Sequence, residues 1–464
     1  MIDPGPRIDI ESSMGDFVKD KRWYGSKGKS IRRVELEYFS RFSEQFFLSV
    51  SRFFYEDGSS ERYFVPFSLH GSGNSFVSVS FHDGTRKLFD ATDDPEFALL
   101  FMRLIMDPAT FSAYPDALRT ERTPFSHDYN IPGDEVRKIT AEQSNTSIVI
   151  GNKFILKIYR KIIGTENPDY TIPVILWQET GFRQTPMPLG KADLLLKDRL
   201  LIATVFRFLQ ESMDGWSRFT GLLQGSLHSG ARVNEILLLE DAAQLGSLTG
   251  NMHSALKIIR PGNDLLFHEY AEKKMLPGVR ANLEDIRHSF SISRNNLSEH
   301  VRIKIDHLLD SAPKHLERLH AIADKFRDLD TMVVHGDYHL GQVLYHDKSY
   351  YVIDFEGEPM RDTSGSFIIS LPHKDIAGMI RSFDYSLAYS LKATGKDVPQ
   401  KFRIEWLNEM MRQFIQSYME TSNINVEIEL LDLFLAEKAI YELKYELNNR
   451  PDWLDIPLTF LERL

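Results

Sequence analysis

Two apolar runs that each end in polar residues are the most constraining feature of this chain. They lie in the stretch TMVVHGDYHLGQVLYHDKSYYVIDFEGEP, which begins at residue 331. The first run enters a polar turn that carries Asp337, and Gln342 follows five residues later. A short hairpin then leads to Asp354 at the end of the second run. We therefore expect a fold in which the ends of two buried strands present carboxylate and amide groups.

Transfer of a phosphoryl group from Mg-ATP to a hydroxyl requires these groups. One carboxylate orients and deprotonates the hydroxyl, while an amide and a second carboxylate hold the magnesium ion. We predict Asp337 as the general base or orienting group, and Gln342 and Asp354 as Mg²⁺ ligands, because oxygen ligands suit a hard cation. Glu356 and Glu358 either contact a second ion or cap the next turn. Turn-forming aspartates are the alternative, but this spacing on two apolar runs favours catalysis.

Composition narrows the class of protein. The 464 residues are 42% hydrophobic and 26% charged, as in soluble globular proteins. The net charge of -11 disfavours nucleic acid as a partner. The most apolar stretch, residues 194–209, contains four charged residues and is too polar to span a membrane. With no cysteine, disulfides and cysteine zinc sites are excluded. We expect a cytoplasmic protein without nucleic-acid or membrane partners, of unspecified oligomeric state.

The pattern of residues is β-rich in the first half and helical in the second. Residues 31–82 contain aromatic and β-branched runs separated by turn residues, which predicts a meander, and residues 95–106 have helical spacing. The predicted organisation is an N-terminal β-rich cap (1–106), a connector (107–133), a small lobe (134–210) and a helical C-terminal lobe (211–464).

Lys157 lies in an alternating apolar strand, where a lysine is unfavourable unless it is paired. Binding of the α- and β-phosphates of ATP, with a glutamate as partner, would account for it. Glu179 is the favoured partner and Glu166 the weaker candidate; a solvent-facing lysine on an edge strand is the alternative. The preceding polar run is predicted to cradle phosphate, although an ordinary turn has a similar composition. Its predicted contacts are Ser144, Asn145 and Ser147.

Several longer motifs together resemble the maltokinase family. They are HGDYHLGQVL, IDFEGEP, KDIAGMIRSFDY, RWYGSKG at 22–28, QSNTS with LKIYRK and NPDY in 143–170, and YELKYELNNRPDWLDIPL at 441–458. Members of that family phosphorylate maltose with ATP to maltose 1-phosphate, which feeds α-glucan synthesis. The resemblance implies an α+β, bilobal, protein-kinase-like fold of the aminoglycoside-phosphotransferase type. It also implies an N-terminal β-rich cap, a mainly helical C-terminal lobe, ATP and Mg²⁺ as cofactors, and maltose as acceptor.

Residue by residue, the resemblance matches Asp337 to the family's catalytic aspartate and Lys157 to its phosphate-anchoring lysine. Gln342 and Asp354 match the magnesium ligands. The chain departs from the family where Tyr170 and Thr171 follow the NPD motif, because an acidic residue is common there, and where Ser26 replaces a common glycine. The first departure bears on the partner of the lysine, and neither touches the chemistry.

The acceptor site is predicted on the C-terminal helices. Lys438, Tyr441 and Tyr445 are spaced i, i+3 and i+7 and project from one side of a predicted helix. Tyrosine rings can pack on a sugar while hydroxyls and the lysine donate hydrogen bonds. Trp453 would close the pocket, and His339 is expected to contact the sugar. An amphipathic core helix with a snorkelling lysine is the alternative, and the resemblance favours binding. A cation here would repel the ammonium of glucosamine but not maltose.

Two other functions remain open at this stage. The first keeps the fold and motif but uses another acceptor, such as glucosamine. The second is a pseudokinase that binds nucleotide or glucan without turnover. The presence of the base, both metal ligands and the lysine argues against the second alternative.

Overall fold

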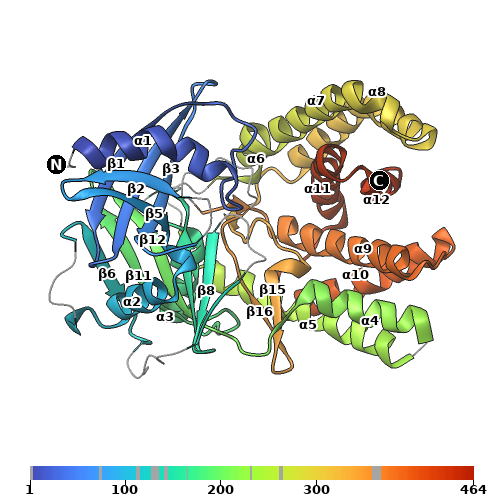
Figure 1. Cartoon of the computed structure of the whole chain (residues 1–464). Coiled ribbons are helices and arrows are strands. Elements are labelled where there is room, and N and C mark those ends of the chain that lie inside the picture. Colours follow the sequence, from blue (N-terminus) through green and yellow to red (C-terminus); the bar gives the residue numbers. More distant parts are fainter. Residues whose placement is uncertain are drawn as a thin grey trace. The chain divides into compact units, whose positions relative to one another are not determined.

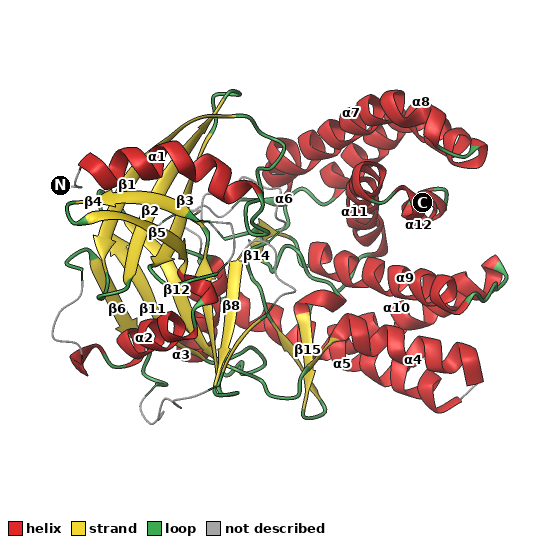
Figure 2. Cartoon of the chain, in the orientation of Figure 1, coloured by secondary structure: helices red, strands yellow, loops and turns green. Residues whose placement is uncertain are grey.

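The computed structural model describes residues 4–72, 76–110, 115–126, 135–139, 145–162, 164, 166–229, 232–260, 265–357 and 367–463. The chain divides into two compact units (Figure 1). The first unit comprises Met1–Gln178, Pro186–Gln210 and Asp362–Ser366. The second comprises Glu179–Thr185, Glu211–Arg361 and Phe367–Leu464. Figure 2 shows that strands dominate the first unit and helices the second.

Two antiparallel sheets frame the first unit. The N-terminal sheet has the order β1-β2-β3-β5-β4, with β10 also pairing with β3, and the second sheet has the order β6-β11-β12-β9-β8-β7. Strands of the N-terminal sheet are β1 (Ile31–Arg41), β2 (Phe46–Tyr55), β3 (Ser60–Ser68), β4 (Val77–Phe81), β5 (Gly84–Asp90) and β10 (Lys161–Ile162). Those of the second sheet are β6 (Leu118–Arg122), β7 (Val136–Lys138), β8 (Asn145–Ile150), β9 (Phe154–Tyr159), β11 (Pro188–Leu195) and β12 (Arg199–Arg207). Strands β1 to β3 confirm the first part of the meander predicted for residues 31–82, but β4 does not follow β3 in the sheet, because β5 lies between them.

The N-terminal sheet is buried on both faces, because alternate residues of its strands enter different cores. Phe46 and Leu48 of β2 join a core with α2 and the second sheet. Phe47 and Phe53 join another with α1. Besides the helix predicted over 95–106, which is α2, the described residues of the unit form short 3-10 turns and two further helices. The bounds are α1 (Pro4–Lys19), η1 (Ala91–Asp93), α2 (Pro95–Met106), η2 (Pro108–Thr110) and α3 (Pro168–Glu179).

Two local sequence signals explain elements of this unit. The side chain of Asp94 accepts a hydrogen bond from the Glu96 amide and Pro95 opens the helix, so α2 begins where a cap and an N-terminal proline predict it. Part of the predicted connector is not a connector: β6 pairs with β11 along its whole length. Leu118 is buried in the core that this sheet shares with α2, but the strand is otherwise polar, so the local pattern does not predict a strand there.

The second unit is built from long helices with short strands inserted between them. Its helices are α4 (Gly215–Ser229), α5 (Arg232–Leu256), α6 (Phe267–Tyr270), η3 (Ala271–Met275), α7 (Leu276–Ser293), η4 (Arg294–Asn296), α8 (Glu299–Lys325), η5 (Leu340–Gln342), α9 (His373–Thr394), α10 (Gln400–Ser422), α11 (Ile428–Asn449), η6 (Pro451–Trp453) and α12 (Asp455–Leu461). Its strands are β13 (Met213–Asp214), β14 (Met332–Val333), β15 (Val343–His346), β16 (Ser349–Val352) and β17 (Ile369–Ser370).

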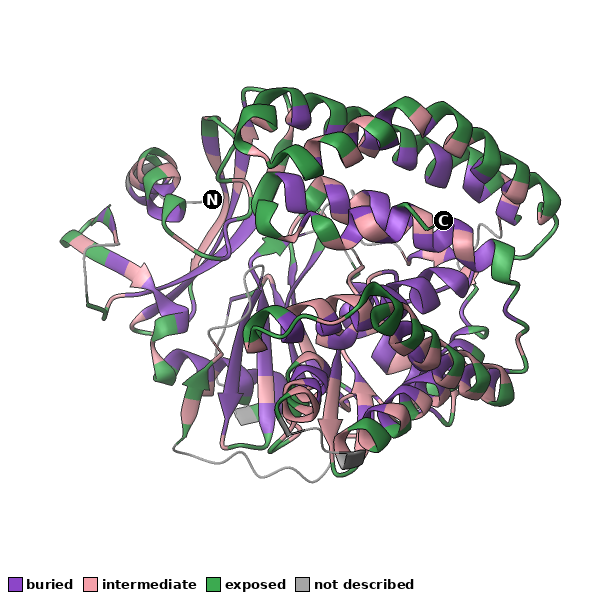
Figure 3. Ribbon diagram, turned by 90° about the vertical axis from the view of Figure 1, so that its right-hand side faces the viewer, coloured by how far each residue is buried: buried purple, intermediate pink, exposed green. Residues whose placement is uncertain are grey.

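The helices of the second unit pack through apolar stripes. In Figure 3 they are banded, with buried residues on their inner sides and exposed residues outside. Helices α5 and α10 approach each other closely, because a Cβ on Gly246 would lie 2.1 Å from the carbonyl oxygen of Phe414. A side chain at that position would therefore force the two helices apart. Across the described part of the chain, every helix is too short or too polar to cross a membrane.

Candidate active site

The loop that carries Asp337 is fixed by glycine and by a buried carboxylate. Gly336 has φ +86, and a Cβ there would lie 2.8 Å from Ile368 Cγ2, so a side chain would be both strained and crowded. Asp375, in the first turn of α9, accepts hydrogen bonds from the backbone amides of His335 and Gly336, each at 2.8 Å. The backbone just before Asp337 is therefore held in one conformation.

Asp375 is itself held by a buried chain of hydrogen bonds. His253 Nε2 lies 3.0 Å from Asp375 Oδ2, and His253 Nδ1 lies 3.0 Å from the hydroxyl of Tyr418. All three side chains are buried. The sequence prediction missed this group. The signal that could have found it is an aspartate directly before the apolar run 376–380, where a buried charge must be paired.

Asp337 is largely buried and is paired with a cation. Its side chain is 14% exposed, and Lys438 Nζ lies 3.2 Å from Oδ1. His339 Nε2 lies 3.7 Å from Oδ2. His339 Nδ1 accepts the Gly341 amide at 3.0 Å, so a neutral ring carries its hydrogen on Nε2, toward the carboxylate. Burial opposes ionisation, but Lys438 and the neighbouring His339 side chain outweigh it and hold the pKa of Asp337 well below its usual range.

The two predicted magnesium ligands lie side by side. Gln342 ends η5 and Asp354 follows β16, and Gln342 Nε2 donates to Asp354 Oδ2 at 3.3 Å. The carbonyl of Gln342 also accepts the Ile353 amide at 3.0 Å, which fixes the start and end of the hairpin together. Asp354 has φ +67, a left-handed conformation that a non-glycine residue adopts only where its surroundings enforce it.

The donor set at this hairpin fits a hard divalent cation. Gln342 offers an amide oxygen and Asp354 a carboxylate, and one oxygen of Glu356 lies within 4.8 Å of an Asp354 oxygen. Oxygen-only donors of this kind suit Mg²⁺ rather than a softer metal. The metal roles of Gln342 and Asp354 stay predictions, and Glu356 is placed where it could assist. Glu358 lies outside the described residues.

Lys157 is paired, but with a different residue from the one predicted. Lys157 Nζ lies 2.9 Å from Asp169 Oδ2, and both side chains are buried. The hydroxyl of Tyr159 donates to the same carboxylate at 2.8 Å. Glu179 is exposed at the other end of α3, so the expected Lys157–Glu179 pair is wrong.

Helix geometry accounts for this correction. Asp169 lies in the first turn of α3, directly after Pro168, whereas Glu179 is ten residues further on. Ten residues of helix rise about 15 Å, too far for both carboxylates to reach one lysine. Asp169, the aspartate of the NPD motif, is therefore the partner of Lys157 instead of Glu179. The neighbouring Tyr170 is buried against Phe206.

The predicted phosphate-contacting residues are only partly described. Ser144 lies outside the described residues. Asn145 and Ser147 are buried on β8, and Ser147 pairs across the ladder with Lys157 on β9. The structure thus brings Ser147 and Lys157 together on neighbouring strands, and their contact with phosphate stays a prediction.

The predicted acceptor face of α11 is split between two clusters. Lys438 points to Asp337, and the ring of Tyr441 lies 5.1 Å from Lys438 Nζ. Tyr445 is 41% exposed and lies beside Arg450 instead. Trp453 is stacked between Tyr385 and Tyr389 of α9, with ring centroids 6.3 and 6.0 Å apart.

This split follows from the length of the helix. A spacing of i to i+7 keeps residues on one side but separates them by about 10 Å along the axis. Tyr445 and Trp453 therefore belong to a cluster around Arg450, while Lys438 and Tyr441 lie near Asp337. The prediction that Trp453 closes the acceptor pocket finds no support in this placement.

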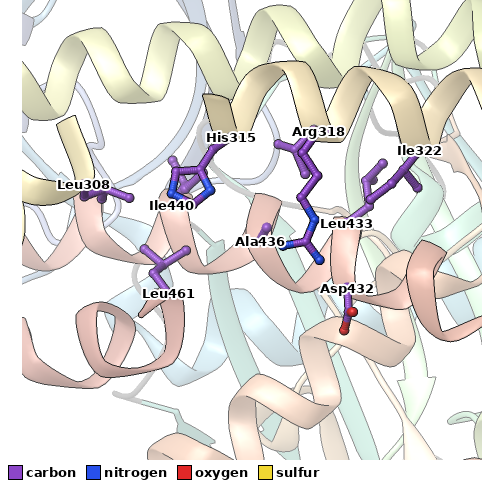
Figure 4. A pocket seen from close by; sticks show the side chains of 10 residues that line it. Leu308, His315, Arg318, Ile322, Asp432, Leu433, Ala436, Ile440 and Leu461 are labelled. Atoms are coloured by element: carbon purple, nitrogen blue, oxygen red, sulfur yellow. The ribbon is translucent and has the colours of Figure 1, made fainter. Parts of the chain in front are cut away.

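The opposite face of α11 packs against α8. Between these helices lies a cavity of about 30 Å³, with Arg318 and Asp432 at one side and Ile440 and Leu461 at the other (Figure 4). A space of this size holds roughly one or two water molecules and no sugar. Since both faces of α11 are occupied, Lys438 is not a snorkelling lysine of a surface helix: its side chain is 15% exposed and ends at Asp337.

Two charged residues near Asp337 were missed by the sequence prediction. Lys374 and Glu437 line a cavity of about 10 Å³ together with Asp337 and Lys438. Both side chains are buried, and Lys374 Nζ lies 3.7 Å from Glu437 Oε2. Two sequence signals could have found them: Lys374 is the first residue of the KDIAGMIRSFDY motif, and Glu437 is a charged residue directly before the predicted site residue Lys438. In this region two lysines lie beside two carboxylates.

Comparison with known proteins relates this chain to phosphotransferases. A family model described as "Phosphotransferase enzyme family" matches residues 195–362. The glucosamine kinase of Streptacidiphilus jiangxiensis is 25% identical over 340 residues, which cover 69% of this chain and 71% of the relative. The glucosamine kinase of Mycolicibacterium smegmatis is 25% identical over 264 residues, covering 56% of this chain and 61% of that protein.

Solved structures give the fold. A glucosamine kinase (crystal form B) has a TM-score of 0.69 at 21% identity, with 97% of this chain and 98% of that chain covered. A glucosamine kinase in complex with glucosamine, ADP and inorganic phosphate has a TM-score of 0.66 at 20% identity, with coverage of 97% and 98%. The chain therefore has the mixed α+β, protein-kinase-like fold of the aminoglycoside-phosphotransferase type, and the predicted fold class is confirmed.

Proposed function

We propose that this protein is an ATP- and Mg²⁺-dependent kinase that phosphorylates a hydroxyl group of a sugar. The observation that carries the proposal is the setting of Asp337: a largely buried carboxylate, paired with Lys438, in a loop whose backbone Asp375 fixes. The adjacent Gln342–Asp354 pair supplies oxygen donors for a metal, and the kinase-like fold supports the same chemistry.

Each residue has a distinct task in this proposal. Asp337 orients the acceptor hydroxyl and receives its proton late in the transfer, which a low pKa allows because alignment and charge placement supply most of the rate. Gln342 and Asp354 would hold Mg²⁺, which when bound offsets charge on the phosphates. Lys157, oriented by Asp169, would bind phosphate oxygens of the nucleotide.

Two acceptors have specific support. The relatives that match this chain are named glucosamine kinases, which favours glucosamine. The sequence motifs resemble those of maltokinases, and Lys438 beside Asp337 favours a neutral sugar such as maltose. In the latter case the product would be maltose 1-phosphate.

The balance of charge near Asp337 supports the neutral sugar. Lys438 lies beside Asp337 and Lys374 beside Glu437, so each carboxylate of this cavity already faces an ammonium group. A substrate ammonium would compete with these lysines and be repelled by them. Sugar hydroxyls carry no charge and could accept hydrogen bonds from the lysines without that penalty. We therefore infer that maltose is preferred and retain glucosamine as the second candidate.

Release of ADP in the presence of Mg-ATP and a panel of sugars tests the proposal. We expect turnover with maltose at a higher kcat/KM than with glucosamine, and loss of turnover in the Asp337→Asn variant. The phosphorylated product, identified by ³¹P NMR, assigns the acceptor. A higher kcat/KM for glucosamine would reverse the acceptor assignment. Nucleotide binding without turnover on any sugar would overturn the kinase proposal and favour a pseudokinase.

A further inference from the structure

Arg160 is a fully buried cation at the end of the strand that carries Lys157. Its Nη2 donates to both carboxylate oxygens of Asp90, at 2.8 and 2.9 Å, and to Thr92 Oγ1. The Trp23 ring lies 4.8 Å from the guanidinium carbon. Asp90 ends β5, Thr92 lies in η1 and Trp23 precedes β1. Two separate segments of the N-terminal region, one around Trp23 and one from Asp90 to Thr92, thus contact the side chain of Arg160.

The backbone after Arg160 is also held by the N-terminal sheet. The carbonyl of Arg160 accepts the Phe64 amide at 2.8 Å, and Lys161 and Ile162 pair with β3 as β10. Lys161 Nζ donates to Glu61 Oε1 at 2.7 Å. Residues 160–162 are therefore built into the N-terminal sheet through backbone and side chains alike.

Arg160 also contacts the strand next to Lys157. Its Nε donates to Thr146 Oγ1 on β8 at 2.9 Å. Thr146 lies between Asn145 and Ser147, the described residues of the predicted phosphate-contacting run, and Ser147 pairs with Lys157. The side chain of Arg160 therefore links β9 to β8. Arg160 is three residues after Lys157, and Thr146 is the residue between Asn145 and Ser147.

We propose that Arg160 is a positioning residue, through which the N-terminal sheet sets β8 and β9 so that Lys157 and Ser147 meet the phosphates of the nucleotide. The inference rests on the proposed kinase function and assigns a task to the N-terminal sheet and to Trp23 of the RWYGSKG motif.

Stability alone is a weak reason for such a cluster. Replacing a buried ion pair with apolar groups of similar size is often neutral or stabilising, whereas removing one partner leaves an unpaired charge. What a guanidinium adds is geometry, because its planar fork fixes several acceptors at once. Here the acceptors come from β5, η1 and β8. Because the Arg160 guanidinium joins β5, η1 and β8 near Lys157, it constrains the positions of these elements more than it increases stability.

Steady-state kinetics of two substitutions at Arg160 test the proposal. In Arg160→Met the fork is lost, and we expect KM for ATP to rise by about tenfold to a hundredfold, as for a misplaced binding group. KM for the sugar should stay within about twofold, because the acceptor residues lie in the other unit. Arg160→Lys keeps the charge and some of the donors, so it should recover part of the loss.

Val79→Ala is the matched control for lost stability. Val79 is a buried residue of β4 in the N-terminal core and pairs with Arg86 of β5, so its truncation should lower Tm without changing KM for ATP. Asp90→Asn is the milder variant if Arg160→Met does not fold, and it should raise KM for ATP in the same direction. Equal KM values for ATP in wild type, Asp90→Asn and Arg160→Met would overturn the proposal, as would a rise in Val79→Ala at a similar loss of Tm.

Direct nucleotide titration separates this inference from the proposed function. Binding of an ATP analogue, followed by calorimetry, needs no turnover. If the wild-type protein binds the analogue but phosphorylates no sugar, the proposed function is wrong. A weaker affinity of Arg160→Met for the analogue would still support the positioning role. If the wild type turns over and Arg160→Met binds the analogue with unchanged affinity, only the positioning role is wrong.

Discussion

The charge on Asp337 is set by Lys438, which reaches the carboxylate from α11 across 3.2 Å. Without a cation, a carboxylate buried to this degree would favour its protonated form. The same lysine thus keeps the proposed base ionised and presents donors to an acceptor. Lys438 had been predicted as a sugar contact, and its electrostatic effect on Asp337 is a second consequence of the same position.

Asp337→Asn should nearly abolish turnover while leaving nucleotide affinity almost unchanged. The amide keeps the size of the side chain but cannot accept the proton of the hydroxyl. We expect kcat to fall by more than about tenfold, measured by ADP release at saturating ATP. Asp347→Asn, in the exposed turn of the β15–β16 hairpin, is the control and should behave as wild type. A variant with near-normal kcat would remove Asp337 from the role of base.

Lys438→Met should move the acid limb of the pH–rate profile to higher pH. Lys438 lowers the pKa of Asp337 against the opposing effect of burial, so its removal lets burial dominate and the pKa rise. Activity that depends on the ionised carboxylate is then lost at a higher pH as the solution is acidified. The measurement is kcat/KM from pH 5 to 8.

Lys444→Met is the matched control for that profile. Lys444 lies on the same helix but pairs with Asp285 at 2.6 Å, so its removal takes away a lysine of α11 without touching Asp337. The two variants should differ only in the acid limb. Coincident profiles would show that Lys438 does not set the ionisation of Asp337.

At the scale of elements, the β15–β16 hairpin carries one predicted magnesium ligand at each of its two ends. Gln342 precedes β15 and Asp354 follows β16, and their backbones are joined by the Ile353–Gln342 hydrogen bond. The tight turn between the strands uses Asp347 and Lys348 in left-handed conformations. The hairpin therefore returns the chain so that both predicted ligands lie at its open end.

Asp354→Ala should abolish activity, whereas Gln342→Ala should raise the magnesium requirement more mildly. A charged ligand contributes more to a hard dication than a neutral amide does. Titration of activity with Mg²⁺ from micromolar to tens of millimolar distinguishes the two variants. Unchanged curves in both would contradict the assignment, and recovery of Asp354→Ala at high Mg²⁺ would reduce the aspartate to a minor ligand.

The elements themselves were largely predictable, because periodicity and turn residues are local signals. The β1–β3 meander, α2 and the β15–β16 hairpin follow from alternation, caps and turns. The sequence could not predict which side chains pair or pack with one another in the folded protein. Asp169 rather than Glu179 pairs with Lys157 because of where α3 starts, and Trp453 lies against α9 because of where α11 ends. Pairing of this kind depends on tertiary packing and not on local pattern.

At the scale of the whole molecule, the N-terminal sheet and the sheet bearing Lys157 form one compact unit rather than a cap added to a separate lobe. Their shared core includes Phe46 of β2, Phe101 of α2 and Leu156 of β9. The buried Asp90–Arg160 pair lies within that unit. We therefore expect the unit to unfold cooperatively, and its acid stability to depend on Asp90.

The stability that Asp90 provides should be present near neutral pH and disappear in acid. Burial alone would raise the pKa of Asp90, but the Arg160 guanidinium outweighs it and lowers that pKa to about 2. In the unfolded chain an aspartate has a pKa of about 3.9. The native state thus binds fewer protons than the unfolded state between these values, and the free energy of unfolding falls as pH falls through that window.

A comparison of wild type with Asp90→Asn therefore isolates this contribution. We expect wild type to be more stable by a margin that is constant above about pH 5 and shrinks by about 2 kcal/mol toward pH 2, because the variant has no carboxylate to protonate. Urea unfolding at pH 5, 3.5 and 2.5 measures the margin. Asp93→Asn removes the exposed pair with Lys138 and, as a control, should change stability by less than about 1 kcal/mol at every pH. A wild-type margin that stays constant down to pH 2.5 would mean that Asp90 carries no depressed pKa, and that Arg160 is held by shape and not by charge.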